Sequence, residues 1–132
     1  MSLVKKLIFH ITLKKYLIVG LINTLATLLI IYSLKWSINL NDVYANFIGY
    51  GVGLIISFNL NKKWIFNHNN ETKFIYLRFL FIAVLSYLAN LIIVLICIYY
   101  LNVNDYISHI FGVPAYTMTG YFGNRFFVFK NK

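Results

Sequence analysis

The sequence predicts an all-α membrane protein with four transmembrane helices, built from two tandem, parallel helical-hairpin repeats. Three observations lead to this prediction. Of the 132 residues, 61% are hydrophobic and only 11% are charged, four long apolar stretches follow one another, and the second half of the chain repeats the first. A soluble domain of this size keeps a larger polar surface, and a disordered chain contains far fewer apolar side chains.

Each of the four apolar stretches is long enough to cross a bilayer, which takes roughly 20 residues in a helix. The segments KWSINLND and LNVND between them are short and predict antiparallel helical hairpins. The longer segment NKKWIFNHNNETK joins one hairpin to the other. In the last stretch, Pro114 removes a helical hydrogen bond and predicts a kink. The stretches cover residues 16–34, 43–60, 79–101 and 106–123.

The two halves of the chain align at an offset of 63 residues without an insertion, residues 15–66 with residues 78–129. Eleven of the 52 aligned pairs are identical, and they include the pattern N-x-N-D, a glycine, and the pattern N-basic-x-aromatic-x-F. Apolar composition alone does not produce such polar matches, so we interpret the pattern as a tandem duplication. Each copy contributes two spans, so both copies enter the membrane in the same direction.

The basic residues gather on one predicted side of the membrane. Eleven of the twelve lie in the N-terminal segment, the central connection or the C-terminal segment, and only Lys35 lies on the other side. This bias predicts that both termini are cytoplasmic. The net charge of +9 then indicates contact with anionic membrane lipids and argues against nucleic acid as a partner.

We treat residues 1–132 as a single transmembrane domain, with an interfacial segment at residues 1–15 and the two repeats at residues 15–66 and 78–129. Within it, residues 1–15 have Leu3, Leu7 and Ile11 at helical spacing and lysines between them. This pattern predicts an amphipathic segment that lies on the inner leaflet.

Small residues recur every four positions in the second span and form one smooth face. Such a face lets helix backbones approach closely in lipid, within one chain or between two copies, which makes a homodimer an expected assembly. Contact with a ligand is the alternative interpretation. The residues are Ala45, Gly49, Gly53 and Ser57.

Polar residues inside the spans are the first candidates for function, because burying them in hydrocarbon is costly. In the first span Asn23 and Thr27 are one turn apart, and Ser86 and Asn90 stand in the third span, with Ser86 63 residues after Asn23 and Asn90 63 after Thr27. These side chains are candidates for contacting sugar hydroxyls. Hydrogen bonds between helices are the alternative.

The inner ends of the second and fourth spans carry N61-K-K-W-I-F66 and N124-R-F-F-V-F129. The cations there are candidates for binding a lipid phosphate, since arginine holds phosphate through two bonds and lysine acts as a point charge; simple anchoring is the alternative. The candidate phosphate ligands are Lys62, Arg125, Arg78, Lys15 and Lys63. The amides of Asn61 and Asn124 are further candidates for contacting the sugar. The aromatic residues Trp64, Phe66, Phe127 and Phe129 are expected in the aromatic belt at headgroup level.

Catalysis is not expected from this sequence. It has no Ser/His/Asp set, HExxH motif, P-loop or metal-binding cluster, and a single cysteine, Cys97. We therefore predict no catalytic residues, no metal and no cofactor. A small multidrug-type exporter is disfavoured as well, because the acids Asp42, Glu71 and Asp105 all lie outside the predicted spans.

The order and spacing of these motifs resemble the GtrA-like family over residues 16–129. The resemblance rests on Y16-L-I-V-G20-L-I-N23-T24, A45-N46, S57-F58 leading into the first N-basic motif, and the second N-basic motif. By resemblance, the elements that carry over are Asn61, Lys62, Trp64, Phe66, Asn124, Arg125 and Phe129.

The resemblance implies translocation of a polyprenyl-phosphate-linked sugar across the bacterial cytoplasmic membrane. The sugar would then be used for cell-surface polysaccharide or teichoic acid glycosylation, with membrane-associated glycosyltransferases as partners. The alternative is a non-transporting membrane anchor for a polyprenyl-phosphate glycosyltransferase, because the same basic face would also dock an enzyme.

Overall fold

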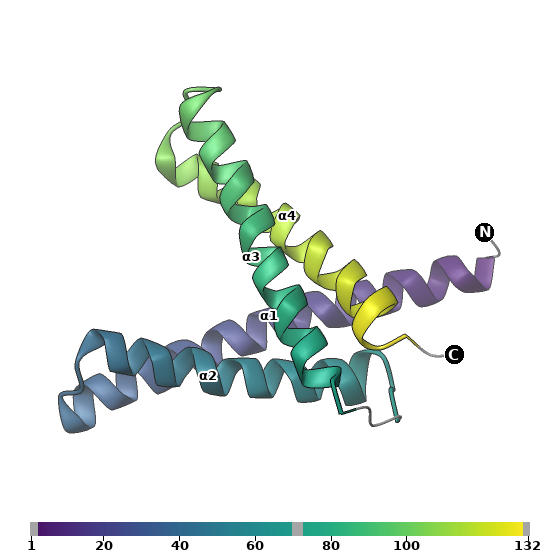
Figure 1. Ribbon diagram of the computed structural model, residues 1–132, viewed down its shortest axis with the longest axis horizontal. Coiled ribbons are helices and arrows are strands. Elements are labelled where there is room, and N and C mark those ends of the chain that lie inside the picture. Colours follow the sequence, from purple (N-terminus) through teal and green to yellow (C-terminus); the bar gives the residue numbers. More distant parts are fainter. Residues whose placement is uncertain (1–2, 70–72, 131–132) are drawn as a thin grey trace. The chain divides into compact units, whose positions relative to one another are not determined.

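The computed structural model describes residues 3–69 and 73–130, and these residues form two compact units. Unit 1 is a hairpin of α1 (Leu3–Ile38) and α2 (Asp42–Leu60), and α2 ends in the π-helical turn η1 (Asn61–Ile65). Unit 2 is a hairpin of α3 (Ile75–Tyr99) and α4 (Asp105–Gly123), and α4 ends in the π-helical turn η2 (Asn124–Val128). The helices of each pair lie side by side (Figure 1). The all-helical fold class is confirmed in the described residues.

Three of the helices described here are long and apolar enough to cross a membrane: Leu3–Ile38, Asp42–Ile65 and Ile75–Tyr99. The fourth helix, α4, has 19 residues but does not belong to this group, and it continues through Pro114. Large apolar side chains remain exposed along the hairpins, among them Leu29, Phe47 and Leu77. Lipid is the solvent that accepts such a surface.

The N-terminal segment differs from the expected one. The predicted amphipathic segment 1–15 and the predicted first span are not separate elements, because α1 is one helix of 36 residues. At about 1.5 Å per residue, this helix is roughly 54 Å long, well beyond a hydrocarbon core of about 30 Å. Figure 1 shows its N-terminal part continuing past the end of α2.

The repeated pattern N-x-N-D forms the tight corner of each hairpin. Asn39 and Asn102 both adopt left-handed backbone conformations, with φ of 49° and 51°, as residues that end helices commonly do. In unit 1 the next asparagine, Asn41, caps α2, because its side chain accepts a hydrogen bond of 2.8 Å from the backbone N–H of Val43. Asparagine suits both positions, which gives the motif a structural purpose.

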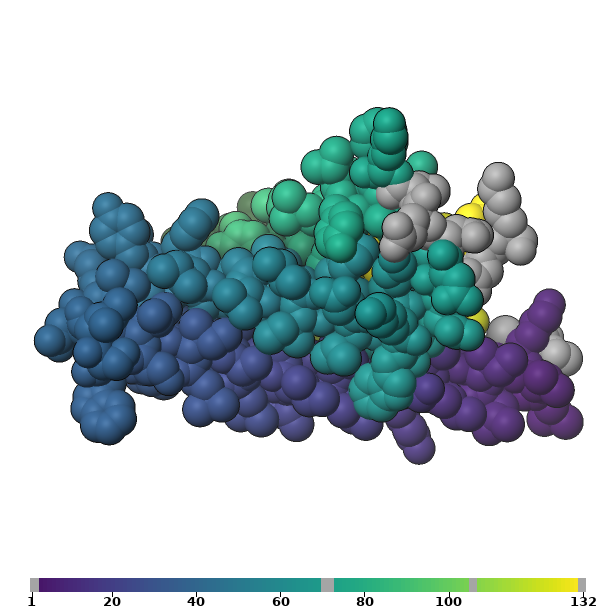
Figure 2. All heavy atoms as spheres, turned by 90° about the horizontal axis from the view of Figure 1, so that it is seen from below, coloured from purple at the N-terminus to yellow at the C-terminus, as the bar shows by residue number. Residues whose placement is uncertain are grey.

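Each hairpin closes on glycines in its second helix. A Cβ atom on Gly49 would lie 2.5 Å from Ile31 Cγ1, and one on Gly112 would lie 2.8 Å from Val94 Cγ2. Ile31 and Val94, like the two glycines, are 63 residues apart in the sequence. Figure 2 shows the side chains of α1 and α2 in contact along the hairpin.

The small-residue face therefore packs inside the chain. Ala45, Gly49 and Gly53 are buried and Ser57 is half-buried, and both glycines approach side chains of α1. Because α1 occupies this face, it is not open to a second copy of the chain. The homodimer predicted through this face would need another surface.

Candidate functional site

In unit 1, the cation of one helix lies against the aromatic ring of the other at the basic end. Lys15 Nζ, from α1, lies 5.5 Å from the centroid of the Trp64 ring in η1. The same Nζ donates a hydrogen bond of 3.4 Å to the backbone carbonyl of Trp64. A lysine over an indole ring is favourable, and the lysine stem also covers apolar surface while the charge stays accessible.

Unit 2 contains the same arrangement 63 residues later. Arg78 Cζ, from α3, lies 5.4 Å from the centroid of the Phe127 ring in η2. The ring of Phe127 also contacts Phe81 at a centroid distance of 6.1 Å. Lys15 with Trp64 and Arg78 with Phe127 are therefore equivalent cation–aromatic pairs, one in each hairpin.

A buried asparagine begins each π-helical turn. Asn61 is 1% exposed and Asn124 is 4% exposed, and the backbone carbonyl of each accepts a hydrogen bond from the N–H five residues later, at 3.0 and 2.8 Å. The side chain of Asn61 donates to the Ser57 carbonyl at 2.7 Å. The Oδ1 atoms of both asparagines are buried without a hydrogen-bond partner.

An unpaired buried acceptor costs about 1–3 kcal/mol. The same cost is present at two equivalent positions, and π-helical turns occur frequently at functional sites. Each Oδ1 atom therefore has acceptor capacity that no group in its own hairpin uses, although neighbouring atoms cover it.

The remaining candidate cations differ in their surroundings. Arg125 is half-buried, and its Nη1 donates a hydrogen bond of 2.6 Å to the hydroxyl of Tyr121. Its guanidinium also lies over the rings of Tyr121 and Phe126, at 5.8 and 5.7 Å. Lys62 is half-buried and Lys63 is exposed in η1. Within each unit, these cations lie at the same hairpin end as the cation–aromatic pair.

This chain belongs to a known family. The family model described as GtrA/DPMS, transmembrane domain, matches residues 15–129, a range that contains the first hairpin from Lys15 onward, the whole second hairpin and both π-helical turns. The GtrA-like resemblance is thereby confirmed. The chain is a GtrA/DPMS transmembrane domain, a multi-pass membrane protein of glycosyl-carrier-lipid sugar metabolism. No curated protein and no solved structure matches it.

The polar residues in the spans of this GtrA/DPMS domain lie between the helices of each hairpin. A Cβ on Gly53 would contact Thr27 Oγ1 and lie 2.9 Å from Asn23 Oδ1, and a Cβ on Gly112 would lie 2.7 Å from Asn90 Nδ2. Ser86 is buried and donates to the Ile82 carbonyl at 2.7 Å. These positions favour a packing role for Thr27, Ser86 and Asn90 over sugar contact. Asn23 Oδ1, like the Oδ1 atoms of Asn61 and Asn124, is buried without a hydrogen-bond partner.

The aromatic candidates of the GtrA/DPMS domain divide into two kinds. Trp64 and Phe127 are 42% and 45% exposed, as expected for residues at headgroup level, and Phe66 is half-buried. Phe129 differs from the expected belt residue. It is 2% exposed and packs against Phe79 at a centroid distance of 6.3 Å, because η2 turns it into the hairpin.

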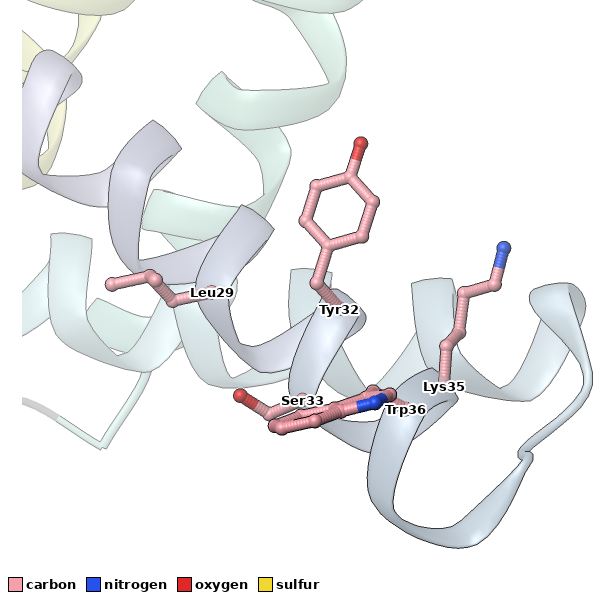
Figure 3. Close-up of a pocket in the computed structure, with 5 residues that line it drawn as sticks. All are labelled: Leu29, Tyr32, Ser33, Lys35 and Trp36. Carbon is pink, nitrogen blue, oxygen red and sulfur yellow. The ribbon is translucent and has the colours of Figure 1, made fainter.

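One surface hollow lies away from the basic ends of this domain. Its lining residues Leu29, Tyr32, Ser33, Lys35 and Trp36 all come from the last turns of α1 (Figure 3). Lys35 also forms an ion pair with Asp42 across the corner, which raises the Lys35 pKa above its usual value through a hydrogen bond and charge attraction. A hollow lined by one helix offers no converging polar groups, so we do not assign function to it.

The sequence of the GtrA/DPMS domain indicated which cations and aromatic residues belong at headgroup level, but not which cation lies over which ring. A signal was present in the repeat, because the 63-residue offset aligns Lys15 with Arg78 and Trp64 with Phe127. In each of these two matches the residue type is kept, a cation in one and an aromatic ring in the other, although the residues are not identical. Tyr121, which binds Arg125, and the π-helical turns had no comparable signal.

Proposed function

We propose that this chain moves a polyprenyl-phosphate-linked sugar across the bacterial cytoplasmic membrane, for glycosylation of a cell-surface polysaccharide or teichoic acid. The observation that carries the proposal is the pair of equivalent hairpin ends, each with a cation over an aromatic ring and a buried, unpartnered asparagine oxygen. Cations suit a lipid phosphate, and the asparagine oxygen suits a sugar hydroxyl. The family connects the chain to glycosyl-carrier lipids.

In this proposal the chain crosses the membrane four times, with both termini and both basic ends in the cytoplasm. The 19 residues of α4 extend roughly 28 Å at about 1.5 Å per residue, close to the thickness of a hydrocarbon core. The distribution of basic residues supports the orientation. Anionic lipids then surround the basic ends on the inner leaflet.

The headgroup moves along the outside of the hairpins and not between their helices. At Gly49 and Gly112 even a methyl group would overlap a side chain of the opposite helix, so a sugar has no room there. The polyprenyl tail stays in lipid throughout, and the protein shelters only the phosphate and sugar. The chain itself makes and breaks no covalent bond.

A second candidate function is that of an anchor for a cytoplasmic glycosyltransferase. The exposed Lys63, Lys73 and Lys14 favour it, because solvent-exposed lysines at the basic ends would attract an acidic protein surface. In that case the chain would orient the enzyme at the membrane without moving its product.

Removing the gene distinguishes the two functions. With translocation, the outer polymer loses its sugar and the lipid-linked sugar accumulates in the membrane, because synthesis continues without export. With anchoring, the polymer also loses its sugar, but the lipid-linked sugar falls because its synthase is not positioned. Mass spectrometry of lipid extracts from both strains measures this difference, and a fall in the lipid-linked sugar would overturn the translocation proposal.

A further inference from the structure

We propose that each hairpin is a complete binding site for one lipid headgroup, so that one chain binds two phosphate lipids at once. The alternative would be one central site to which the two hairpins each contribute half. The inference rests on the proposed function for the class of ligand, a lipid phosphate that carries hydroxyl groups.

Each hairpin contains every element of the proposed site without help from the other. In unit 1, α1 supplies Lys15 and η1 supplies Trp64 and Asn61. In unit 2, α3 supplies Arg78 and η2 supplies Phe127 and Asn124. The cation–aromatic distances agree within 0.1 Å, at 5.5 and 5.4 Å, and each asparagine has an unpartnered Oδ1.

Each proposed site combines donors for a phosphate with an acceptor for a hydroxyl group. An ammonium or guanidinium group that lies over an aromatic ring keeps N–H donors for a phosphate. A carboxamide oxygen repels phosphate oxygens but accepts a hydrogen bond from a hydroxyl group. The combination of donors and acceptor therefore suits a phosphate ester that also carries hydroxyl groups, as a polyprenyl-phosphate sugar and phosphatidylglycerol both do.

The cation–aromatic pairs are accessible from outside each hairpin, but the asparagine oxygens are not. Trp64 and Phe127 are both close to half exposed, so a headgroup in the membrane interface can reach the cation–aromatic pairs. The asparagine oxygens are covered by neighbouring atoms. When a lipid occupies the site, the side chains that cover Oδ1 must therefore have moved away from it.

Native mass spectrometry of the purified full chain, titrated with polyprenyl-phosphate glucose, tests the number of sites. We expect two bound lipids on the native chain, one on Lys15→Gln, one on Arg78→Gln and none on the double variant at the same lipid concentration. Each lost site should bind at least about tenfold more weakly, as expected for a charge-assisted bond. A single bound lipid on the native chain, or two on the double variant, would overturn the proposal.

Matched variants separate loss of the site from loss of the fold. Lys14→Gln removes the neighbouring charge on α1, where the side chain is exposed, and should still bind two lipids. Lys15→Arg and Arg78→Lys keep a cation over the ring and should also bind two. If Lys15→Gln or Arg78→Gln still binds two lipids, the cation–aromatic pairs are not the sites.

Two further binding measurements identify the class of lipid that supplies the phosphate and the role of the asparagines. Polyprenyl phosphate without sugar should bind about two- to tenfold more weakly than the glycosylated lipid, and Asn61→Leu with Asn124→Leu should abolish that preference. Equal binding of phosphatidylglycerol would assign the sites to ordinary phospholipid.

Two bound lipids without translocation would overturn the proposed function alone, whereas translocation with one bound lipid would overturn this inference alone.

Discussion

The double variant Lys62→Gln/Arg125→Gln is expected to abolish sugar transfer to the outer polymer while the protein is still made and inserted. Each substitution removes a half-buried cation from a π-helical turn, so in the proposed function each hairpin loses a phosphate ligand that acts in addition to its cation–aromatic pair. At about 1.5–3 kcal/mol for each charge-assisted bond, binding should weaken by roughly tenfold or more at each site. The measurement is the amount of labelled sugar on the cell-surface polymer, with protein level followed by immunoblot.

The control for this variant is Lys5→Gln/Lys6→Gln, which removes two charges from the N-terminal part of α1. Both lysines are exposed and precede the region of the family match. We expect this control to transfer sugar normally, which separates a lost phosphate ligand from a weakened positive-inside signal. Full transfer by Lys62→Gln/Arg125→Gln would contradict a phosphate role for these cations.

Replacing Gly49 or Gly112 by leucine is expected to force the helices of one hairpin apart. A Cβ alone already lies 2.5 Å from Ile31 at Gly49 and 2.7 Å from Asn90 at Gly112. Overpacking of this kind costs about 3 kcal/mol, which corresponds to a fall of roughly 10 °C in the melting temperature of a chain this size. Thermal unfolding of the purified protein in detergent, followed by circular dichroism, measures it.

Gly51→Leu is the matched control, because nothing lies within 4 Å of a Cβ at Gly51 although it stands on the same helix. Leucine there should leave the melting temperature unchanged or raise it, since glycine costs about 1 kcal/mol in a helix. An equal loss of stability in Gly49→Leu and Gly51→Leu would mean that helix contact at Gly49 does not hold the hairpin together.

The helices were predictable because their signals are local and strong. Apolar stretches interrupted by N-x-N-D mark where α1 and α3 end, and the structure starts α2 and α4 at the two aspartates of that motif. The continuity of α1 was not predictable in the same way. Lysines at positions 14 and 15 suggested a boundary between an interfacial segment and a span, but a lysine does not interrupt a helix.

The chemistry of the site was predictable, but its geometry was only partly so. Residue types indicated that Lys15 and Trp64 belong at headgroup level, but only the fold places one against the other. The burial of Phe129 was not predictable, because it depends on the π-helical turn. Such a turn needs one extra residue in a helical register, and the sequence has no strong signal for that.

The most direct test of the account is movement of a labelled polyprenyl-phosphate sugar across liposomes that contain only this protein. We expect inner-leaflet lipid to become accessible to an outside reagent much faster in liposomes that contain the purified chain than in empty liposomes. Liposomes with Lys62→Gln/Arg125→Gln should match the empty ones, and Lys5→Gln/Lys6→Gln should match the native chain. Movement no faster than in empty liposomes, with the native protein folded and inserted, would contradict translocation by this chain.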